Sequence, residues 1–196
     1  MPVKRLGPRL RPSLTGVPTI IWFRRDLRLA GNPALTAAID AARADPDPRV
    51  VPLFVVEPTW WASIDDHHRA HVLAALRSLD AAVDDQLLLQ HGDPARILPA
   101  LVRAASATSV HIAVEHRSPA PAGDLEVAAA LDVALVRTDA PADLFAEPGS
   151  SPYDLPGSAA APGAVRWWMP VECHGYPIGP DILAGPRAGQ PQSSAD

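Results

Sequence analysis

Short apolar runs and amphipathic stretches alternate along most of the first 140 residues of this 196-residue chain. Runs of branched and aromatic side chains, typical of buried strands, cover about residues 20–23, 50–56, 86–90, 110–115 and 133–136. Stretches with apolar residues at helical spacing lie between them and begin near residues 33, 66, 94 and 124. This alternation predicts an α/β fold with a doubly wound, Rossmann-like, five-stranded parallel sheet, because right-handed crossovers place helices on both faces.

The composition predicts one folded domain between two irregular flanks. Residues 1–17 mix basic residues with prolines and lack the apolar segment of a signal peptide, so we expect a disordered lead-in. Residues 18–145 hold every predicted strand and helix. Residues 146–196 are rich in Pro, Gly and Ser, which favours an irregular tail that is partly docked or disordered. Within this tail, residues 165–170 carry two tryptophans and could dock on the domain as an aromatic clasp.

Charge and hydropathy exclude several classes of protein. Hydrophobic residues make up 47%, charged residues 20%, and the net charge is -5, as in soluble globular proteins without a general attraction to nucleic acid. No direct DNA binding is therefore expected of this chain alone. The single Cys173 cannot form an internal disulfide, and no apolar run approaches the roughly 20 residues that cross a bilayer. We expect a cytoplasmic protein that does not enter a membrane.

Charged residues follow the first predicted strand and end the fourth. They are Arg24, Arg25, Asp26 and Arg28 in the first group, and Glu115, His116 and Arg117 in the second. If the two strands are neighbours, both groups face the carboxyl edge of the sheet, where such folds bind ligands. Guanidinium groups pair with anions and stack on rings, so one hypothesis is a cleft for an anionic or planar ligand. The other is that Asp26 pairs with the nearby arginines and holds the loop.

Other signatures of chemistry are absent or incomplete. Neither the Gly-x-Gly-x-x-Gly dinucleotide fingerprint nor a phosphate loop follows the first strand, and there is no Gly-x-Ser-x-Gly elbow. Cys173 lies in a proline-rich segment without a scaffold for nucleophilic catalysis. His67 and His71 could share a helix face, but a zinc site needs further ligands that no second cluster supplies, which favours a solvated helix start. No metal site and no catalytic residue are predicted.

A long motif occupies residues 22–29, Trp-Phe-Arg-Arg-Asp-Leu-Arg-Leu, with Asn-Pro-Ala-Leu at residues 32–35. Further matching segments follow in order at residues 51–56, 91–94, 144–145 and 148–149. On these residues the chain resembles the amino-terminal α/β domain of the DNA photolyase and cryptochrome family, over about residues 18–153. The resemblance implies a five-stranded domain that often holds an antenna chromophore, either a folate or a deazaflavin.

The resemblance also implies a larger helical domain that binds FAD and receives the flipped pyrimidine dimer. The sequence shows no counterpart of it after residue 153, so we expect a stand-alone or truncated domain, without FAD or catalysis on this chain alone. Two departures from the family pattern argue against an antenna chromophore. Gly31 stands where an Asp is usual, and residues 118–123 read Ser-Pro-Ala-Pro-Ala-Gly where acidic and arginine residues are usual.

Three functional hypotheses remain open at this point. The first is a domain related to light-dependent DNA repair or blue-light sensing that is not catalytic by itself. The second is a small-molecule or nucleotide-binding module that uses the predicted cleft. The third is an interaction subunit that pairs with a separate flavin-binding chain or with a second copy of itself. If they are exposed, the aromatic residues that could serve such an interface are Trp60, Trp61, Trp167 and Trp168. The alternative is that the two tryptophans of the tail cover the surface that the helical domain would otherwise occupy.

Overall fold

A computed structural model describes residues 17–115, 122–141 and 165–170, together with residues 173, 175 and 178. These residues form one sheet of parallel strands in the order β3-β2-β1-β4-β5, with β6 paired to β2. The strands are β1 (Thr19–Phe23), β2 (Arg49–Val56), β3 (Leu88–His91), β4 (Ser109–Glu115), β5 (Ala134–Ala140) and β6 (Arg166–Trp167). The helices are α1 (Pro33–Ala42), α2 (Pro58–Ser63), α3 (Asp66–Ala82), α4 (Pro94–Ala105) and α5 (Ala122–Ala130).

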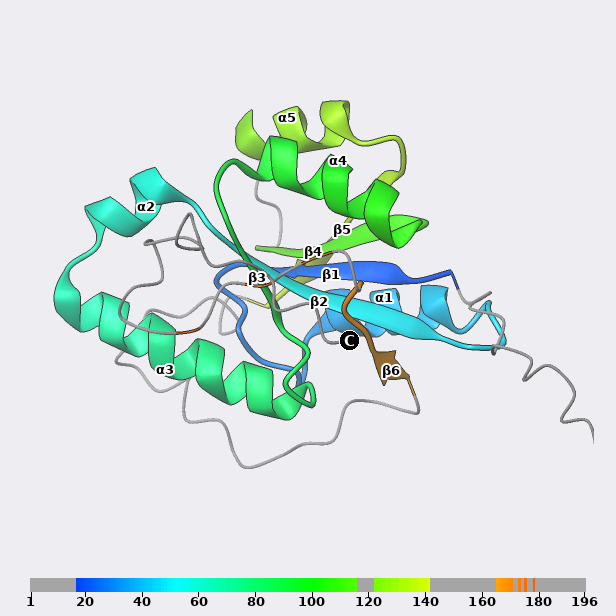
Figure 1. Cartoon of the computed structure of the whole chain (residues 1–196), viewed down its shortest axis with the longest axis horizontal. Coiled ribbons are helices and arrows are strands. Elements are labelled where there is room, and N and C mark those ends of the chain that lie inside the picture. The colour runs from blue at the N-terminus through cyan, green and yellow to red at the C-terminus, as the bar shows by residue number, and fades with distance from the viewer. Residues whose placement is uncertain are drawn as a thin grey trace, which may run out of the picture.

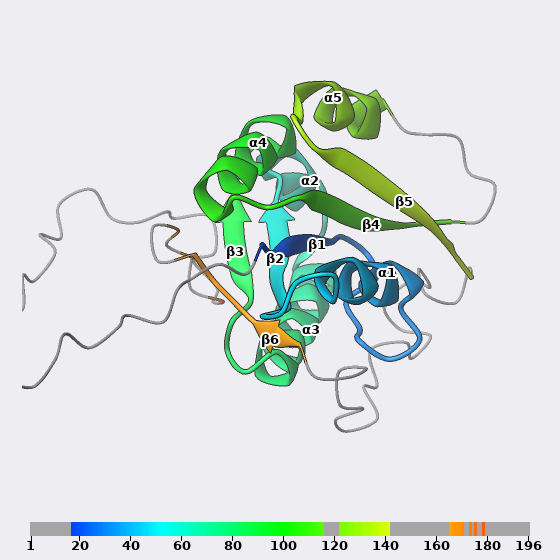
Figure 2. The same cartoon turned by 90° about the vertical axis from the view of Figure 1, so that its right-hand side faces the viewer.

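Helices cover both faces of this sheet (Figures 1 and 2). Helices α1 and α3 lie on one face, and α4 and α5 lie on the other. Side chains of β1 alternate between the two layers: Ile21 and Phe23 pack with α1 and α3, whereas Ile20 and Trp22 pack with α4. Every residue of β1 and β2 is buried, as expected for central strands of a doubly wound sheet. The predicted fold class is therefore confirmed.

Several element boundaries differ from the sequence-based expectation. The third strand begins at Leu88 rather than at residue 86, because Asp84 and Asp85 both adopt the left-handed conformation and turn the chain before it. The fifth strand extends to Ala140, four residues beyond the predicted end. Helix α2 was not predicted, and residues 166–167 form a short strand within the segment that was suggested as a clasp. All but residue 17 of the predicted lead-in, and most of the predicted tail, lie outside the described residues.

No helix in the described part of the chain is both long and apolar enough to cross a bilayer.

Strand β4 carries a buried histidine beneath helix α1. His111 is 3% exposed, and its Nε2 atom lies 2.9 Å from the Ser109 hydroxyl. Among the described residues its Nδ1 atom has no hydrogen-bond partner. Burial lowers the pKa of His111 to about 4, so the side chain is neutral in the folded protein near pH 7.

The low pKa of His111 predicts that the folded protein loses stability as the pH falls. The unfolded chain takes up the proton near pH 6.5, whereas the folded protein takes it up only near pH 4, so stability falls as the pH drops between these values. Between pH 7.5 and pH 5 we expect the free energy of unfolding to fall by about 2 kcal/mol through this group. Urea denaturation of the wild type and of His111→Leu at both pH values measures it. Equal falls in the two proteins would refute the assignment to His111.

Candidate functional site at the carboxyl edge of the sheet

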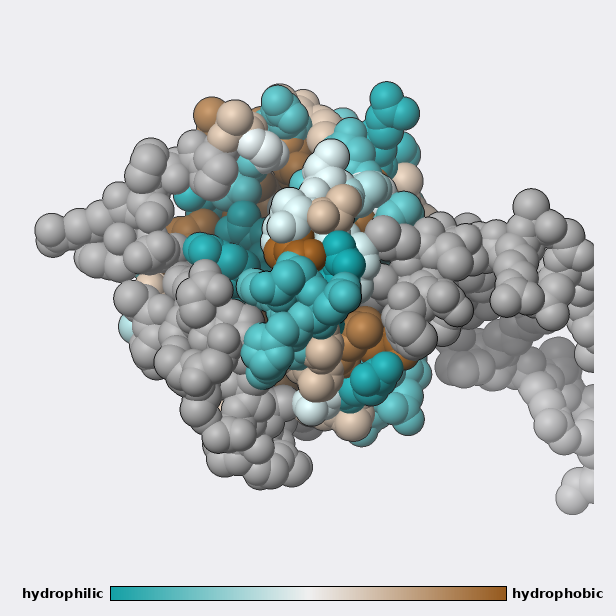
Figure 3. Space-filling model, turned by 90° about the vertical axis from the view of Figure 1, so that its left-hand side faces the viewer, coloured by the Kyte–Doolittle hydropathy of each residue, from teal (hydrophilic) through white to brown (hydrophobic). Residues whose placement is uncertain are grey.

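The carboxyl ends of β1 and β4 meet where the direction of the crossovers reverses. The two strands are neighbours, which meets the condition that the hypothesis of a ligand cleft required. The chain leaves β1 toward α1 on one face of the sheet and leaves β4 toward α5 on the other, which makes this pair of strand ends the topological switch point. Figure 3 views the molecule from this side, and its coloured surface is mainly hydrophilic with small apolar areas.

Arg24 bridges three elements at the switch point. Its Nη1 atom donates to Asp124 Oδ1 over 2.7 Å, and its Nη2 atom donates to the Ala113 carbonyl over 2.8 Å. The guanidinium also lies over the Trp22 ring, 5.3 Å from its centroid. Arg24 therefore ties the end of β1 to β4 and to the first turn of α5. These contacts engage most of the guanidinium within the protein.

A second arginine reaches the same carboxylate. Arg137 on β5 places Nε 3.6 Å from Asp124 Oδ2, and Asp124 is only 4% exposed. Within the described residues, Asp124 Oδ2 and both Nε and Nη2 of Arg137 are buried without a hydrogen-bond partner. Arg137 Nε and Asp124 Oδ2 face each other just beyond hydrogen-bond length, so the described contact between these two buried atoms is an ion pair. Two guanidinium groups against one carboxylate leave a net positive charge at this point.

Asp26 holds the loop that follows β1. Its carboxylate accepts the Arg24 backbone amide at 2.8 Å and the Asn32 side-chain amide at 3.0 Å, and the residue is 1% exposed. Burial raises the pKa of Asp26, while these hydrogen bonds and the charge of Arg24 oppose the rise. One of the two hypotheses for this loop was that Asp26 pairs with the neighbouring arginines. The described contacts instead join it to one arginine's backbone and to an asparagine.

Asn32 connects this loop to helix α1. Its side-chain oxygen accepts the amides of Ala34 and Leu35, each over 3.1 Å, which caps the helix. Its side-chain nitrogen donates to Asp26 Oδ2 and to the Arg28 carbonyl over 3.2 Å. One buried amide thus orients the arginine loop and starts the helix.

The structure describes the remaining predicted site residues to different extents. Arg25 is exposed and Arg28 is half-buried, and both lie on the loop that Asp26 and Asn32 hold. Glu115 ends β4, beside the end of β1, but its side chain is outside the description. His116 and Arg117 lie in the segment 116–121, outside the described residues. The proposed meeting of the two charged groups therefore stays a prediction.

A pair of carboxylates lies farther along the same edge, after β2 and β3. Glu57 follows β2 and Asp93 caps helix α4 after β3. Partial loss of hydration raises the pKa of Glu57, the nearby charge of Asp93 adds to the rise, and Arg24 opposes it. Glu57 and Asp93 therefore bring negative charge to the edge beside β2 and β3.

Sequence reasoning missed Arg137 and the bond between Asp26 and Asn32. The available signal for Arg137 was its place directly after the apolar run 133–136, because a charged residue in a partly buried strand needs a partner. Asn32 caps α1, and its bond to Asp26 depends on where the loop before it folds.

The described residues offer no alternative metal site. They contain no group of three or more His, Cys, Asp or Glu side chains placed to hold an ion. His67 and His71 stack edge to face with ring centroids 4.3 Å apart, and His71 Nδ1 lies 3.0 Å from the His67 carbonyl. Two hollows of about 590 and 380 Å³ lie at the opposite edge, where the strands begin.

The sequence of this chain is similar to those of known proteins. The family model described as DNA photolyase matches residues 19–154. A deoxyribodipyrimidine photo-lyase from Agrobacterium fabrum is 36% identical over 107 residues, which are 50% of this chain and 20% of that protein. A cryptochrome DASH from Natronomonas pharaonis is 29% identical over 123 residues, 58% of this chain and 25% of that protein. The chain thus spans a quarter or less of these two relatives.

Solved structures show the same fold. An archaeal photolyase from Sulfolobus tokodaii, whose structure holds two FAD molecules, has a TM-score of 0.54 and 17% identity over 63% of this chain and 29% of its own. A cryptochrome from Synechocystis has a TM-score of 0.52 and 16% identity over 63% of this chain and 28% of its own. At these identities the likeness concerns the fold.

Proposed function

The chain belongs to the DNA photolyase family, and we propose that its α/β unit serves a flavin-dependent protein of light-driven DNA repair or blue-light sensing without reversing pyrimidine dimers by itself. The observation that carries the proposal is the extent of the match. Residues 19–154 contain every strand from β1 to β5, and they correspond to a small part of each relative. The flavin chemistry would be supplied by a further domain or by a separate flavin-binding chain.

The switch point offers a partial fit for an antenna chromophore. A chromophore would supply light absorption there. Arg24 is engaged by Asp124 and the Ala113 carbonyl, and Asp26 is enclosed by its loop, so these two residues shape the edge rather than face a ligand. The exposed Arg25 and the half-buried Arg28 would meet an anionic group.

A repair assay tests the proposed function. The purified 196-residue protein is mixed with DNA that contains pyrimidine dimers and is illuminated with near-ultraviolet or blue light. We expect no dimer reversal, because flavin photochemistry is not supplied by the residues described above. Full-length deoxyribodipyrimidine photo-lyase from Agrobacterium fabrum serves as the positive control for the assay. Dimer reversal by the 196 residues alone would overturn the proposal.

An absorption spectrum of the native protein tests the chromophore separately. A band at longer wavelength than tryptophan and tyrosine absorb would show a bound chromophore. In that case Arg25→Ala should weaken the band, whereas Arg103→Ala, an exposed arginine on α4, should leave it unchanged. A band that is unaffected by Arg25→Ala would place the chromophore away from this loop.

A further inference from the structure

A groove runs along the edge of the sheet beside the first half of β2. Strand β3 has only four residues and pairs with residues 53–56 of β2, so it leaves the beginning of β2 without a neighbour on that side. Strand β6 fills this place, with Arg166 opposite Arg49 and Trp167 opposite Val50 (Figure 2). The Arg166 amide donates to the Pro48 carbonyl and the Trp168 amide donates to the Val50 carbonyl, each over 3.0 Å. The geometry is that of strand addition.

The two tryptophans of this segment anchor it on opposite faces of the sheet. Trp167 is 8% exposed and packs in the layer of α1 and α3. Trp168 packs against the layer of α4, together with Met169. Alternate side chains of an extended segment point to opposite sides, which is why two adjacent tryptophans can grip both layers.

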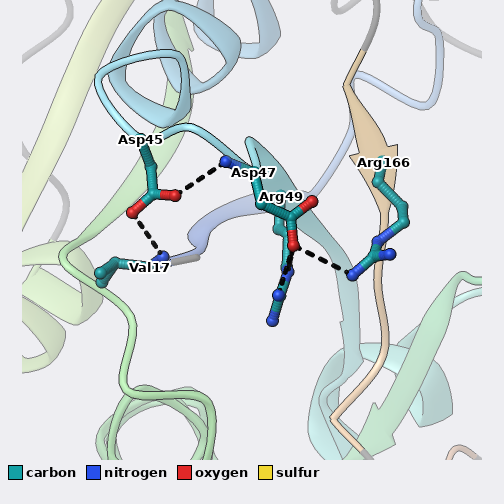
Figure 4. A network of polar contacts seen from close by, with 5 residues as sticks. All are labelled: Val17, Asp45, Asp47, Arg49 and Arg166. Atoms are coloured by element: carbon teal, nitrogen blue, oxygen red, sulfur yellow. Dashed lines mark hydrogen bonds and ion pairs between the residues drawn. The ribbon is translucent and has the colours of Figure 1, made fainter. Parts of the chain in front are cut away.

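On the domain side of the groove, Asp47 and Arg49 form a charged pair, here called the charged anchor. Arg49 is 2% exposed, and both its Nε and Nη2 atoms donate to Asp47 Oδ2, the former over 2.9 Å. The same oxygen accepts Arg166 Nη2 over 3.2 Å, so Asp47 lies between the two arginines (Figure 4). The Arg49 guanidinium also lies 5.4 Å from the Trp168 ring centroid, a cation–π contact.

Contacts within the domain fix this anchor independently of β6. Asp45 Oδ1 accepts the Asp47 amide over 2.9 Å, and Asp45 Oδ2 accepts the Val17 amide over 3.1 Å (Figure 4). Hydrogen bonding from Arg49 lowers the pKa of Asp47, which keeps the carboxylate charged for the basic residue of a bound peptide. The groove is also incompletely filled, since a hollow of about 380 Å³ remains between Asp84 and β6.

We propose that this groove is a binding site for an extended peptide in which a basic residue precedes two tryptophans, and that residues 165–170 fill it within the same chain. The backbone edge of β2 would supply affinity, Asp47 would select the basic residue, and Arg49 with the two apolar layers would select the aromatic pair. The occupying segment lies outside the family-matched residues 19–154, and the groove does not depend on the light-related function.

A peptide-binding experiment on the full chain tests the site. The double variant Trp167→Ser, Trp168→Ser removes both aromatic anchors so that residues 165–170 leave the groove, and this variant is called the emptied protein. Circular dichroism checks that it is folded. A fluorescent peptide of residues 163–170 is titrated by anisotropy. We expect micromolar binding to the emptied protein and binding at least about tenfold weaker to the wild type, whose own segment competes at high effective concentration. A peptide with both tryptophans replaced by serine should not bind.

Two further variants probe the charged anchor in the emptied protein. Asp47→Asn should weaken peptide binding about fivefold, because it removes the carboxylate that pairs with the peptide's basic residue. Asp40→Asn, on the exposed face of α1, is the matched control and should leave binding unchanged. Equal binding of the peptide to the wild type and the emptied protein, or no binding to a folded emptied protein, would overturn the proposal.

Hydrogen exchange on the unmodified protein tests the same site without any substitution, and it applies even if the emptied protein does not fold. A segment that binds a preformed groove can leave it without global unfolding. The amides of Arg166 and Trp168 should therefore exchange at least about tenfold faster than those of β1, as resolved by NMR. Exchange of these amides only at the rate of the β1 core would show that the segment is an inseparable part of the fold.

Discussion

Asn32→Ala is expected to lower the free energy of unfolding by about 3 kcal/mol, more than the loss of an ordinary helix cap, which costs about 1 kcal/mol. The side chain caps α1 and also donates to the buried Asp26 carboxylate and to the Arg28 carbonyl. Its removal leaves a carboxylate that is 1% exposed with one fewer hydrogen bond, and buried polar groups without partners are costly. Urea denaturation measures the change.

The matched control for this prediction is Asp93→Ala. Asp93 caps α4 by accepting the Ala95 amide at 2.9 Å, but it is exposed and joins no buried network. We expect the ordinary capping loss of about 1 kcal/mol for it. If the two variants lose the same stability, the bond between Asn32 and Asp26 adds nothing and the explanation fails.

Arg24→Met is also expected to lower the free energy of unfolding by about 3 kcal/mol. The substitution keeps part of the side-chain volume but removes the hydrogen-bonded partner of Asp124, which is 4% exposed. Among the described residues, Asp124 would then retain the 3.6 Å contact with Arg137. A buried charge that loses its partner destabilises a protein far more than an exposed ion pair does. Thermal or urea denaturation gives the magnitude.

Two variants separate this effect from a general loss of charge. Arg25→Met, at the exposed neighbouring position, should change stability by no more than about 0.5 kcal/mol. The double variant of Arg24→Met with Asp124→Asn should recover part of the loss, with a coupling of about 1 kcal/mol or more. Additive effects of the two substitutions would contradict a direct pair.

The layout of the site was only partly predictable. Arg24, Asp26 and Asn32 stand within nine residues of one another, and their loop and helix start follow from local chemistry. The partner of Arg24 is 100 positions away along the chain, and Arg137 lies on a strand of its own. These contacts arise because β4 inserts beside β1, while β5 lies beyond β4. Strand spacing in the sequence does not encode that order.

By itself, the sequence determined the α/β class, the alternation of strands and helices, and the arginine motif that marks the family. Each depends on hydrophobic periodicity or on residues a few positions apart. Only the tertiary structure decided that Asp124 holds Arg24, that Asn32 satisfies Asp26, and that residues 166–167 add a strand to β2. The first and third of these pairings join residues 100 or more positions apart, and the second depends on how the loop after β1 folds. Burial then makes each contact strong enough to matter.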